Sequence, residues 1–234
     1  MLHIVRSALI DIRDCLFDFV YPPLCLVCGR LLDNGSERVC ADCWSTIPAV
    51  TGDLPLLQET CGKLLETGLI DAMCSAFVFE KEGAFQKIVH SLKYSGDRKI
   101  GLELGRRIGA RMVAEGIRAD FLVPIPLHKR KQRERGYNQS ELIARGCGER
   151  TAMPVRIDLI ARKKFTQTQT ALTLLQRREN MEGAFEACSM EVKGRSIVLI
   201  DDVMTTGSTI LSCAHVLRNA GAARIIAASA AIAE

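Results

Sequence analysis

The stretch "IVLIDDVMTTGSTI" (residues 197–210) decides the fold of this chain. A run of branched apolar residues leads directly into two adjacent carboxylates, Asp201 and Asp202, and small hydroxyl residues with one glycine follow them. A continuous apolar run is typical of a strand covered on both faces, as in a parallel sheet with helices on either side. The stretch therefore predicts a buried strand over 196–200, a polar loop, and a helix over 208–219.

The loop after this strand has the composition of an anion-binding turn. In open α/β sheets, ligands bind beyond the carboxyl ends of the strands, and the first N–H groups of the next helix lack partners within it. Small residues let a phosphate approach these groups closely. The two carboxylates would repel that phosphate, so they favour sugar hydroxyls, a Mg²⁺ ion, or both. A phosphorylated sugar satisfies both requirements.

A purely structural role for the loop accounts for less of its sequence. A helix cap explains one hydroxyl residue, but not two acids followed by the small residues of 205–209. The sequence lacks the GxxxxGK[ST] signature of P-loop proteins, and no GxGxxG follows a strand. The phosphosugar interpretation is therefore preferred.

Length and composition fit an ordinary globular protein. The 234 residues are 48% hydrophobic and 25% charged, enough for one α/β domain with a small appendage. The net charge of +4 does not by itself indicate a nucleic-acid binder. No apolar run reaches bilayer-spanning length, and charged residues interrupt the apolar N-terminal segment, which makes it a poor signal peptide. We expect a cytoplasmic protein without stable membrane insertion.

Strand and helix patterns alternate along most of the chain. An amphipathic helix is expected over 2–19, docked on the protein rather than on a membrane, and a connector over 44–72. The other strands are expected at 74–80, 121–126, 155–160 and 224–233, and the other helices at 84–94, 98–115 and 138–150. This order predicts a mostly parallel sheet with helices on both faces. We expect an N-terminal region over 1–60 and an α/β domain over 61–234.

Four cysteines near the N-terminus have the spacing of a metal site. Cys25 and Cys28 are separated by two residues, as are Cys40 and Cys43, and eleven residues lie between the pairs. This spacing is typical of a structural zinc ion with four thiolate ligands and no open position. The alternative is a set of buried free thiols. The remaining cysteines are expected to be core thiols, at positions 15, 61, 74, 147, 188 and 213.

A dense basic run follows the strand at 121–126. Its cations are Lys129, Arg130, Lys131, Arg133 and Arg135. Such a run is usually a solvated face, but this one lies at the expected ligand edge of the sheet, where it could meet pyrophosphate or a DNA backbone. Two tyrosines near it, Tyr94 and Tyr137, could stack on bases or simply pack.

Residues 197–210 resemble the phosphoribosyl pyrophosphate (PRPP) loop of type I phosphoribosyltransferases, in which two acids follow a hydrophobic strand and precede T-T-G-S/T. The resemblance implies a type I phosphoribosyltransferase-like fold and PRPP bound with Mg²⁺. It also implies that Asp201 and Asp202 contact the ribose hydroxyls. The 5′-phosphate would then be held by Thr205, Thr206, Gly207, Ser208 and Thr209.

Nearly the whole chain is similar to ComF/GntX-type proteins. The shared motifs are, in order, "CLVCG…C..C", "LKYSGD" (92–97), "VPIPLHKRKQRERGYNQS" (123–140), "TQTQTALTLLQRRENMEGAF" (166–185) and the DD-TTGST loop. The resemblance implies a pyrophosphate loop that begins at Val123 and a lid over 162–181. Many relatives carry a second cysteine pair, but here only Cys61 with Gly62 matches it, which argues against a second metal site.

The resemblance also implies a role in natural competence, the uptake of DNA by bacteria. The chain is then expected to be a PRPP-binding, phosphoribosyltransferase-like protein that serves DNA uptake and transformation, with DNA-uptake proteins or single-stranded DNA as partners. Two alternatives stay open: a non-catalytic protein that senses PRPP or handles single strands, and a nucleobase phosphoribosyltransferase of nucleotide salvage. The sequence identifies neither the acceptor nor the oligomeric state.

Overall fold

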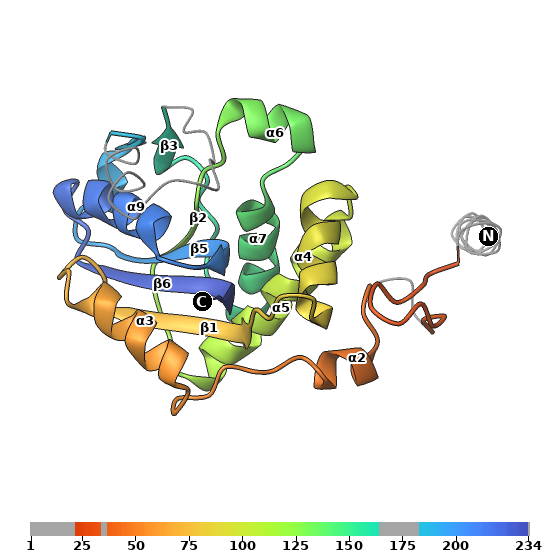
Figure 1. Ribbon diagram of the computed structural model, residues 1–234. Coiled ribbons are helices and arrows are strands. Elements are labelled where there is room, and N and C mark those ends of the chain that lie inside the picture. Colours follow the sequence, from red (N-terminus) through yellow and green to blue (C-terminus); the bar gives the residue numbers. More distant parts are fainter. Residues whose placement is uncertain (1–21, 34–36, 164–182, 234) are drawn as a thin grey trace, which may run out of the picture.

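A computed structural model describes residues 22–33, 37–163 and 183–233. Its centre is a parallel sheet of four strands in the order β1–β6–β5–β2 (Figure 1). The strands are β1 (Ala72–Val78), β2 (Phe121–Pro124), β5 (Ser196–Met204) and β6 (Arg224–Ile232). The predicted parallel sheet is confirmed. The helix expected over 2–19 and most of the expected lid lie outside the described residues.

Helices cover both faces of the sheet (Figure 1). Val198 and Ile200 of β5 belong to one hydrophobic core, which contains residues of α4 (Ala84–Tyr94), α5 (Arg98–Ala114) and α7 (Gln139–Thr151). Ile197 and Leu199 belong to the other, with residues of α3 (Pro55–Leu65) and α9 (Ser208–Asn219). Because successive side chains of a strand point to opposite faces, burial on both faces requires the unbroken apolar run that the sequence shows.

Two of these helices, α5 and α7, touch backbone to backbone. A Cβ added at Gly105 would lie 2.1 Å from the carbonyl oxygen of Ile143, and one added at Gly146 would lie 2.2 Å from that of Leu102. Only glycine allows so close an approach. The contact fixes α7, whose first residues lie at the end of β2, next to the carboxyl edge of the sheet.

Gly105→Ala is therefore expected to destabilise the protein by about 3 kcal/mol, the upper part of the usual range for overpacking, because backbone atoms must move. Urea unfolding measures the effect. The matched control is Gly62→Ala on α3, where an added Cβ meets nothing within 4 Å and alanine improves helix propensity. Equal urea midpoints for the two variants would show that the helices do not pack this closely.

The segment expected to be a connector contains a helix, α3. Pro55 and Gly62 look like helix breakers in the sequence. Pro55 instead occupies the first turn of α3, where a missing N–H costs nothing, and Gly62 has no close neighbour. The apolar residues between them bury Leu64 against the sheet. The connector expected over 44–72 therefore contains a helix that the sequence did not predict.

The strand expected over 155–160 is also different in the structure. Val155 makes one isolated parallel bridge to Leu122, and β3 (Ile160–Arg162) pairs antiparallel with β4 (Phe185–Ala187) in a separate two-stranded sheet. The predicted helices over 84–94 and 208–219 are confirmed at both ends. Three short helices complete the described residues: α2 (Ala41–Ser45), α6 (Lys129–Arg135) and the 3₁₀ helix η1 (Met190–Val192).

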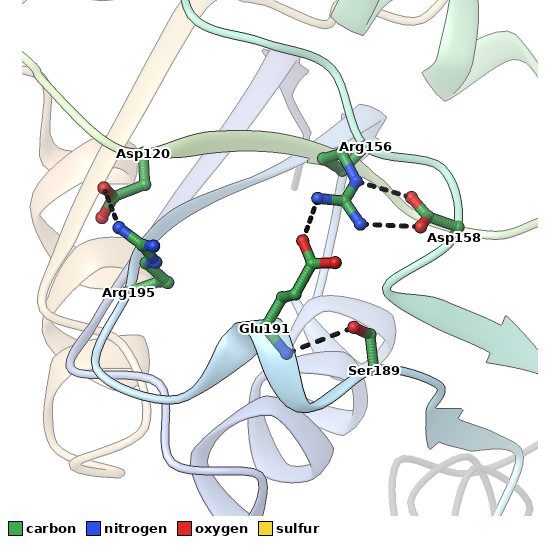
Figure 2. A network of polar contacts seen from close by, with 6 residues as sticks. All are labelled: Asp120, Arg156, Asp158, Ser189, Glu191 and Arg195. Carbon is green, nitrogen blue, oxygen red and sulfur yellow. Dashed lines mark hydrogen bonds and ion pairs between the residues drawn. The ribbon is translucent and has the colours of Figure 1, made fainter.

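Ion pairs close the amino edge of the sheet (Figure 2). Arg156 binds Asp158 at 2.7 Å and also pairs with Glu191 of η1. Arg195 lies 3.3 Å from Asp120, which also accepts a hydrogen bond of 2.8 Å from the backbone N–H of Ser196. These largely exposed pairs tie the loops together and contribute little stability individually. No helix among the described residues is long and apolar enough to cross a membrane.

Candidate functional site

The two adjacent carboxylates lie within β5, at the carboxyl edge of the sheet. β5 extends past Ile200 to Met204, because Asp201 pairs with Ser229 of β6 and the pairing continues to the end of the strand. On the other side, β2 pairs with β5 only as far as Ile200. The predicted strand over 196–200 was therefore too short. β5 projects past β2, and this projection places Asp201 beside the start of α7 and Asp202 beside the last turn of α4.

Asp201 is partly buried and hydrogen-bonded. The Oγ of Ser140, in the first turn of α7, donates a hydrogen bond of 3.2 Å to Asp201 Oδ1, and the backbone N–H of Asp202 donates one of 2.9 Å to the same oxygen. Desolvation and the neighbouring charge of Asp202 raise the pKa of Asp201 to about 7. Asp201 therefore changes its charge near neutral pH.

Asp202 is held by a lysine that was not singled out from the sequence. The Nζ of Lys93, in the last turn of α4, lies 2.9 Å from Asp202 Oδ2. The two side chains are 24% and 14% exposed, so the pair is mostly shielded from water. Lys93 belongs to the "LKYSGD" motif, but more than a hundred residues separate it from Asp202. The sequence alone therefore does not show that the two residues pair.

The "RGYN" segment (135–138) fixes the geometry around this pair. The buried Tyr137 donates a hydrogen bond of 2.6 Å from Oη to the carbonyl oxygen of Leu92, which anchors the end of α4. Asn138 caps α7 through the N–H of Ser140, and its Nδ2 donates a bond of 2.9 Å to the carbonyl oxygen of Ile125. This short segment thus holds the end of α4 and the start of α7 in place, which brings Lys93 and Ser140 to the two carboxylates.

The exposure of Tyr137 and Tyr94 shows which of them could stack on a base and which only packs. Tyr137 packs and cannot stack on a base, whereas Tyr94 is 68% exposed at the end of α4. The guanidinium of Arg135 lies 5.6 Å from the centre of the Tyr94 ring, and the ring of His90 lies 5.0 Å from it. An exposed aromatic ring beside a cation can stack on a base.

The predicted phosphate loop joins β5 to α9. Thr205 and Thr206 are exposed, and Ser208 begins α9. Gly207 is the N-cap residue of α9, so it offers no side-chain acceptor to the amides of the first turn. Its φ of +70° favours glycine, and an added Cβ would lie 2.6 Å from Leu64 Cδ2. The first turn of this helix can therefore receive an anion, and Ser208 and Thr209 add hydroxyl groups.

The basic run forms α6, and its cations do not all face the same way. Lys129, Arg130 and Arg133 are exposed, and Arg130 pairs with Glu134 at 3.0 Å. Lys131 and Arg135 are partly buried. Desolvation and the charges of Arg135, Arg162 and Lys93 lower the pKa of Lys131, so these three cations lie within electrostatic reach of Lys131. Part of the run is therefore on the side of Lys93, which binds Asp202, and the rest faces solvent.

The four predicted metal ligands meet in one cluster. The sulfur atoms of Cys25, Cys28, Cys40 and Cys43 all lie within 4.8 Å of one another, and those of Cys28 and Cys40 are 3.8 Å apart. A tetrahedral zinc ion with Zn–S bonds of about 2.3 Å requires sulfur atoms about 3.8 Å apart. The cluster therefore fits a structural zinc ion. In the part of the chain that the structure describes, it is the only such group.

The four-cysteine segment (residues 25–43) is attached to α5 through a buried carboxylate. Glu103 accepts hydrogen bonds of 2.6 Å from the indole N–H of Trp44 and 2.8 Å from the backbone N–H of Arg38. The Arg107 guanidinium lies 3.8 Å from the centre of the Trp44 ring, and Arg38 pairs with Asp97 at 2.5 Å. The pKa of Glu103 is raised, chiefly by desolvation. The segment is thus part of the folded body of the protein.

The other cysteines follow the core-thiol prediction only in part. Cys74, Cys147 and Cys213 are buried as expected. Cys188 is exposed because it follows the short strand β4 at the surface, so that prediction was wrong. Cys61 lies on α3, away from the four-cysteine cluster, and is partly buried. Cys15 lies outside the described residues.

A separate groove of about 490 Å³ runs along α4. It is lined by one face of α4, by the residues just before and after this helix, and by Leu26 of the four-cysteine segment. None of the site residues predicted from the sequence lines it.

Two family models match the chain. The phosphoribosyl transferase domain matches residues 152–232, which include β5, the acid pair and the loop before α9. The double zinc ribbon domain matches residues 16–77, which include all four cysteines of the cluster.

Known proteins also match the chain, two of them over most of its length. The DNA utilization protein YhgH of Escherichia coli O157:H7 is 30% identical over 207 residues, 86% of this chain and 87% of that protein. The competence protein ComFC of Bacillus subtilis is 26% identical over 231 residues, 87% and 92% of the two chains. Competence protein F of Haemophilus influenzae is 35% identical over 108 residues, 45% and 47% of the two chains. The chain therefore belongs to the ComF/GntX-type competence family, with an N-terminal zinc-ribbon region and a type I phosphoribosyltransferase-like fold.

Proposed function

We propose that this protein binds PRPP together with Mg²⁺ at the carboxyl edge of β5. The observation that carries the proposal is the juxtaposition of two carboxylates at the sheet edge with the amino end of α9. The carboxylates of Asp201 and Asp202 would accept hydrogen bonds from the ribose hydroxyls. The amides and hydroxyls of 205–209 would hold the 5′-phosphate.

The pyrophosphate group would face the cations of α6. Arg135 and Lys93 lie within electrostatic reach of Lys131, and Lys93 itself binds Asp202. Lys129, Arg130 and Arg133 would add to the field from the exposed side. Mg²⁺ bound with PRPP would supply further positive charge to the pyrophosphate.

As an enzyme, the protein would transfer the phosphoribosyl group to a nitrogen nucleophile. The bond from C1 to pyrophosphate breaks, the bond from C1 to nitrogen forms, and pyrophosphate leaves with the electron pair. The protein would contribute mainly positioning and electrostatic stabilisation of these charges. The alternatives are a protein that only senses PRPP at the same site and a nucleobase phosphoribosyltransferase of nucleotide salvage.

Thermal unfolding of the full chain tests this proposal. PRPP with Mg²⁺ should raise the unfolding midpoint, because a ligand that binds only the folded state stabilises it. A panel of nucleobases with an assay for released pyrophosphate separates an enzyme from a sensor. An unchanged midpoint at millimolar PRPP, with and without Mg²⁺, would refute the proposal.

A second candidate function is the handling of single-stranded DNA during natural competence, in the cytoplasm. The names of the relatives, "DNA utilization protein" and "Competence protein", motivate it. The observation that favours it is that the exposed ring of Tyr94, at the end of α4, lies beside Arg135, at the end of α6. A single strand could stack a base on Tyr94 while the cations of α6 contact phosphates.

If α6 binds single strands, changing Arg130, Arg133 and Arg135 together to alanine should weaken binding and flatten its salt dependence. The logarithmic slope should fall by about 0.7 for each phosphate that the variant no longer neutralises, with little dependence on base sequence. Fluorescence anisotropy with a labelled oligonucleotide measures both quantities.

The matched control changes three exposed cations at the opposite side of the sheet, Arg118, Lys193 and Arg224. The DNA hypothesis fails if the wild type does not bind at low salt. Equal effects of the two triple variants would place any DNA site elsewhere.

We also propose an N-terminal four-cysteine region (1–60) and a phosphoribosyltransferase-like domain (61–234), with the boundary inside α3, a helix that both would share. The two share one hydrophobic core, because the Trp44 ring stacks on Phe77 with their centres 5.3 Å apart. They would therefore unfold together once zinc is bound.

A further inference from the structure

The ion pair between Lys93 and Asp202 is placed where the proposed ligand must bind. Asp202 uses Oδ1 to accept a hydrogen bond of 2.7 Å from the N–H of Val203, and Lys93 holds Oδ2 at 2.9 Å. A ribose hydroxyl that binds Oδ2 of Asp202 must therefore share that oxygen with the lysine or displace it.

The fold does not need this pair for its stability. α4 is already anchored by fully buried residues such as Ile88 and Leu92, and by the hydrogen bond from Tyr137 to the end of the helix. A mostly buried ion pair costs about as much desolvation as it gains in attraction. Lys93 also stands in the last turn of α4, where the helix dipole favours a cation. Lys93 therefore places a positive charge at the site, although α4 would stay in place without the ion pair to Asp202.

The surroundings of Lys93 show where its ammonium group could go. The guanidinium of Arg135 lies 5.6 Å from the ring centre of Tyr94, the residue next to Lys93, and the charges of Arg135 and Lys93 both act on Lys131. An anionic group placed among these cations would attract the ammonium group away from Asp202. The carboxylate would then be open to the ribose hydroxyls.

We propose that Lys93 is a specificity-determining residue that exchanges partners on binding: it holds Asp202 in the free protein and contacts the pyrophosphate of the ligand in the complex. This inference rests on the proposed binding of PRPP. It explains how the site would reject ribose 5-phosphate, which has the same ribose and 5′-phosphate. That sugar must compete with Lys93 for Asp202 and offers the lysine no second anion in return.

Lys93→Met tests both contacts of the lysine, the one to pyrophosphate and the one to Asp202, because methionine keeps an unbranched side chain and removes the charge. PRPP should bind at least about tenfold more weakly, the size of one charge-assisted hydrogen bond. Ribose 5-phosphate should bind equally well or more tightly, since Asp202 is no longer occupied. The preference for PRPP should therefore fall by tenfold or more. Lys93→Arg, which keeps the charge, should restore part of it.

Isothermal calorimetry of the full chain with PRPP and with ribose 5-phosphate, both with Mg²⁺, measures this preference. The control is Lys87→Met on the same helix, whose ammonium donates to the carbonyl oxygen of Val27 instead; it should leave the preference unchanged. Lys93→Gln is the second variant if the methionine variant does not fold. A parallel loss of affinity for both ligands, or an unchanged preference, would overturn the inference. Failure of the wild type to bind PRPP would refute the proposed function and the inference together.

Discussion

Replacing Asp201 and Asp202 together with asparagine is expected to weaken PRPP binding by at least about a hundredfold and to leave the fold intact. Each carboxylate that accepts a hydrogen bond from a ribose hydroxyl contributes about 1.5–3 kcal/mol, so the loss of two corresponds to a factor of about 10² or more. The fold should survive, because both side chains lie at the sheet edge and the change removes a repulsion between them. Calorimetry measures the affinity, and circular dichroism the fold.

A double variant of matched charge is the control for this experiment. Glu59→Gln with Glu149→Gln also removes two carboxylates, but these pair with Lys63 and Arg106, two cations that the proposed site does not use. PRPP affinity should stay the same in this control. Unchanged affinity in the double aspartate variant would show that these two acids do not hold the ribose.

Cys40→Ser is expected to release zinc and to loosen residues 22–60. Bound zinc supplies about 10–16 kcal/mol to the folding of isolated zinc-finger peptides, and the four-cysteine segment has few apolar residues of its own. Trp44 is the single tryptophan of the chain, and it is buried against Glu103 and Arg107. Its fluorescence should therefore shift to longer wavelength as the segment loosens. Elemental analysis gives the zinc content of the same samples.

The control for this change is Cys188→Ser, which removes an exposed thiol far along the chain from the cluster. It should retain one equivalent of zinc and the emission of the wild type. Full zinc content in Cys40→Ser, or an unchanged emission spectrum, would contradict the assignment of Cys40 as a ligand that holds the segment together.

The parts of the fold that could be predicted from the sequence are those whose signal is local. β5 is covered on both faces, so its apolar run is continuous, and the bounds of α4 and α9 follow from their apolar periodicity. α3 was missed because Pro55 can either break a helix or begin one, and only packing of Leu64 decides.

The parts of the site that could not be predicted depend on contacts between distant segments. Asp201 and Asp202 stand out in the sequence, but Lys93 and Ser140 reach them only because Tyr137 and neighbouring Asn138 join α4, β2 and α7. The burial of Tyr137 likewise depends on its bond to an element that precedes it by more than forty residues. No spacing rule within the motifs contains this information.

The most direct measurement of the central claim is the change in backbone amide chemical shifts when PRPP and Mg²⁺ are added to ¹⁵N-labelled protein. A 5′-phosphate held at the amino end of α9 must perturb the amides that surround it. We predict saturable shifts that are largest at 205–209, with smaller ones at Asp201 and Asp202 and none at the amino edge around Arg195. A saturable titration whose largest shifts lie along the α4 groove, with none at 205–209, would contradict the account.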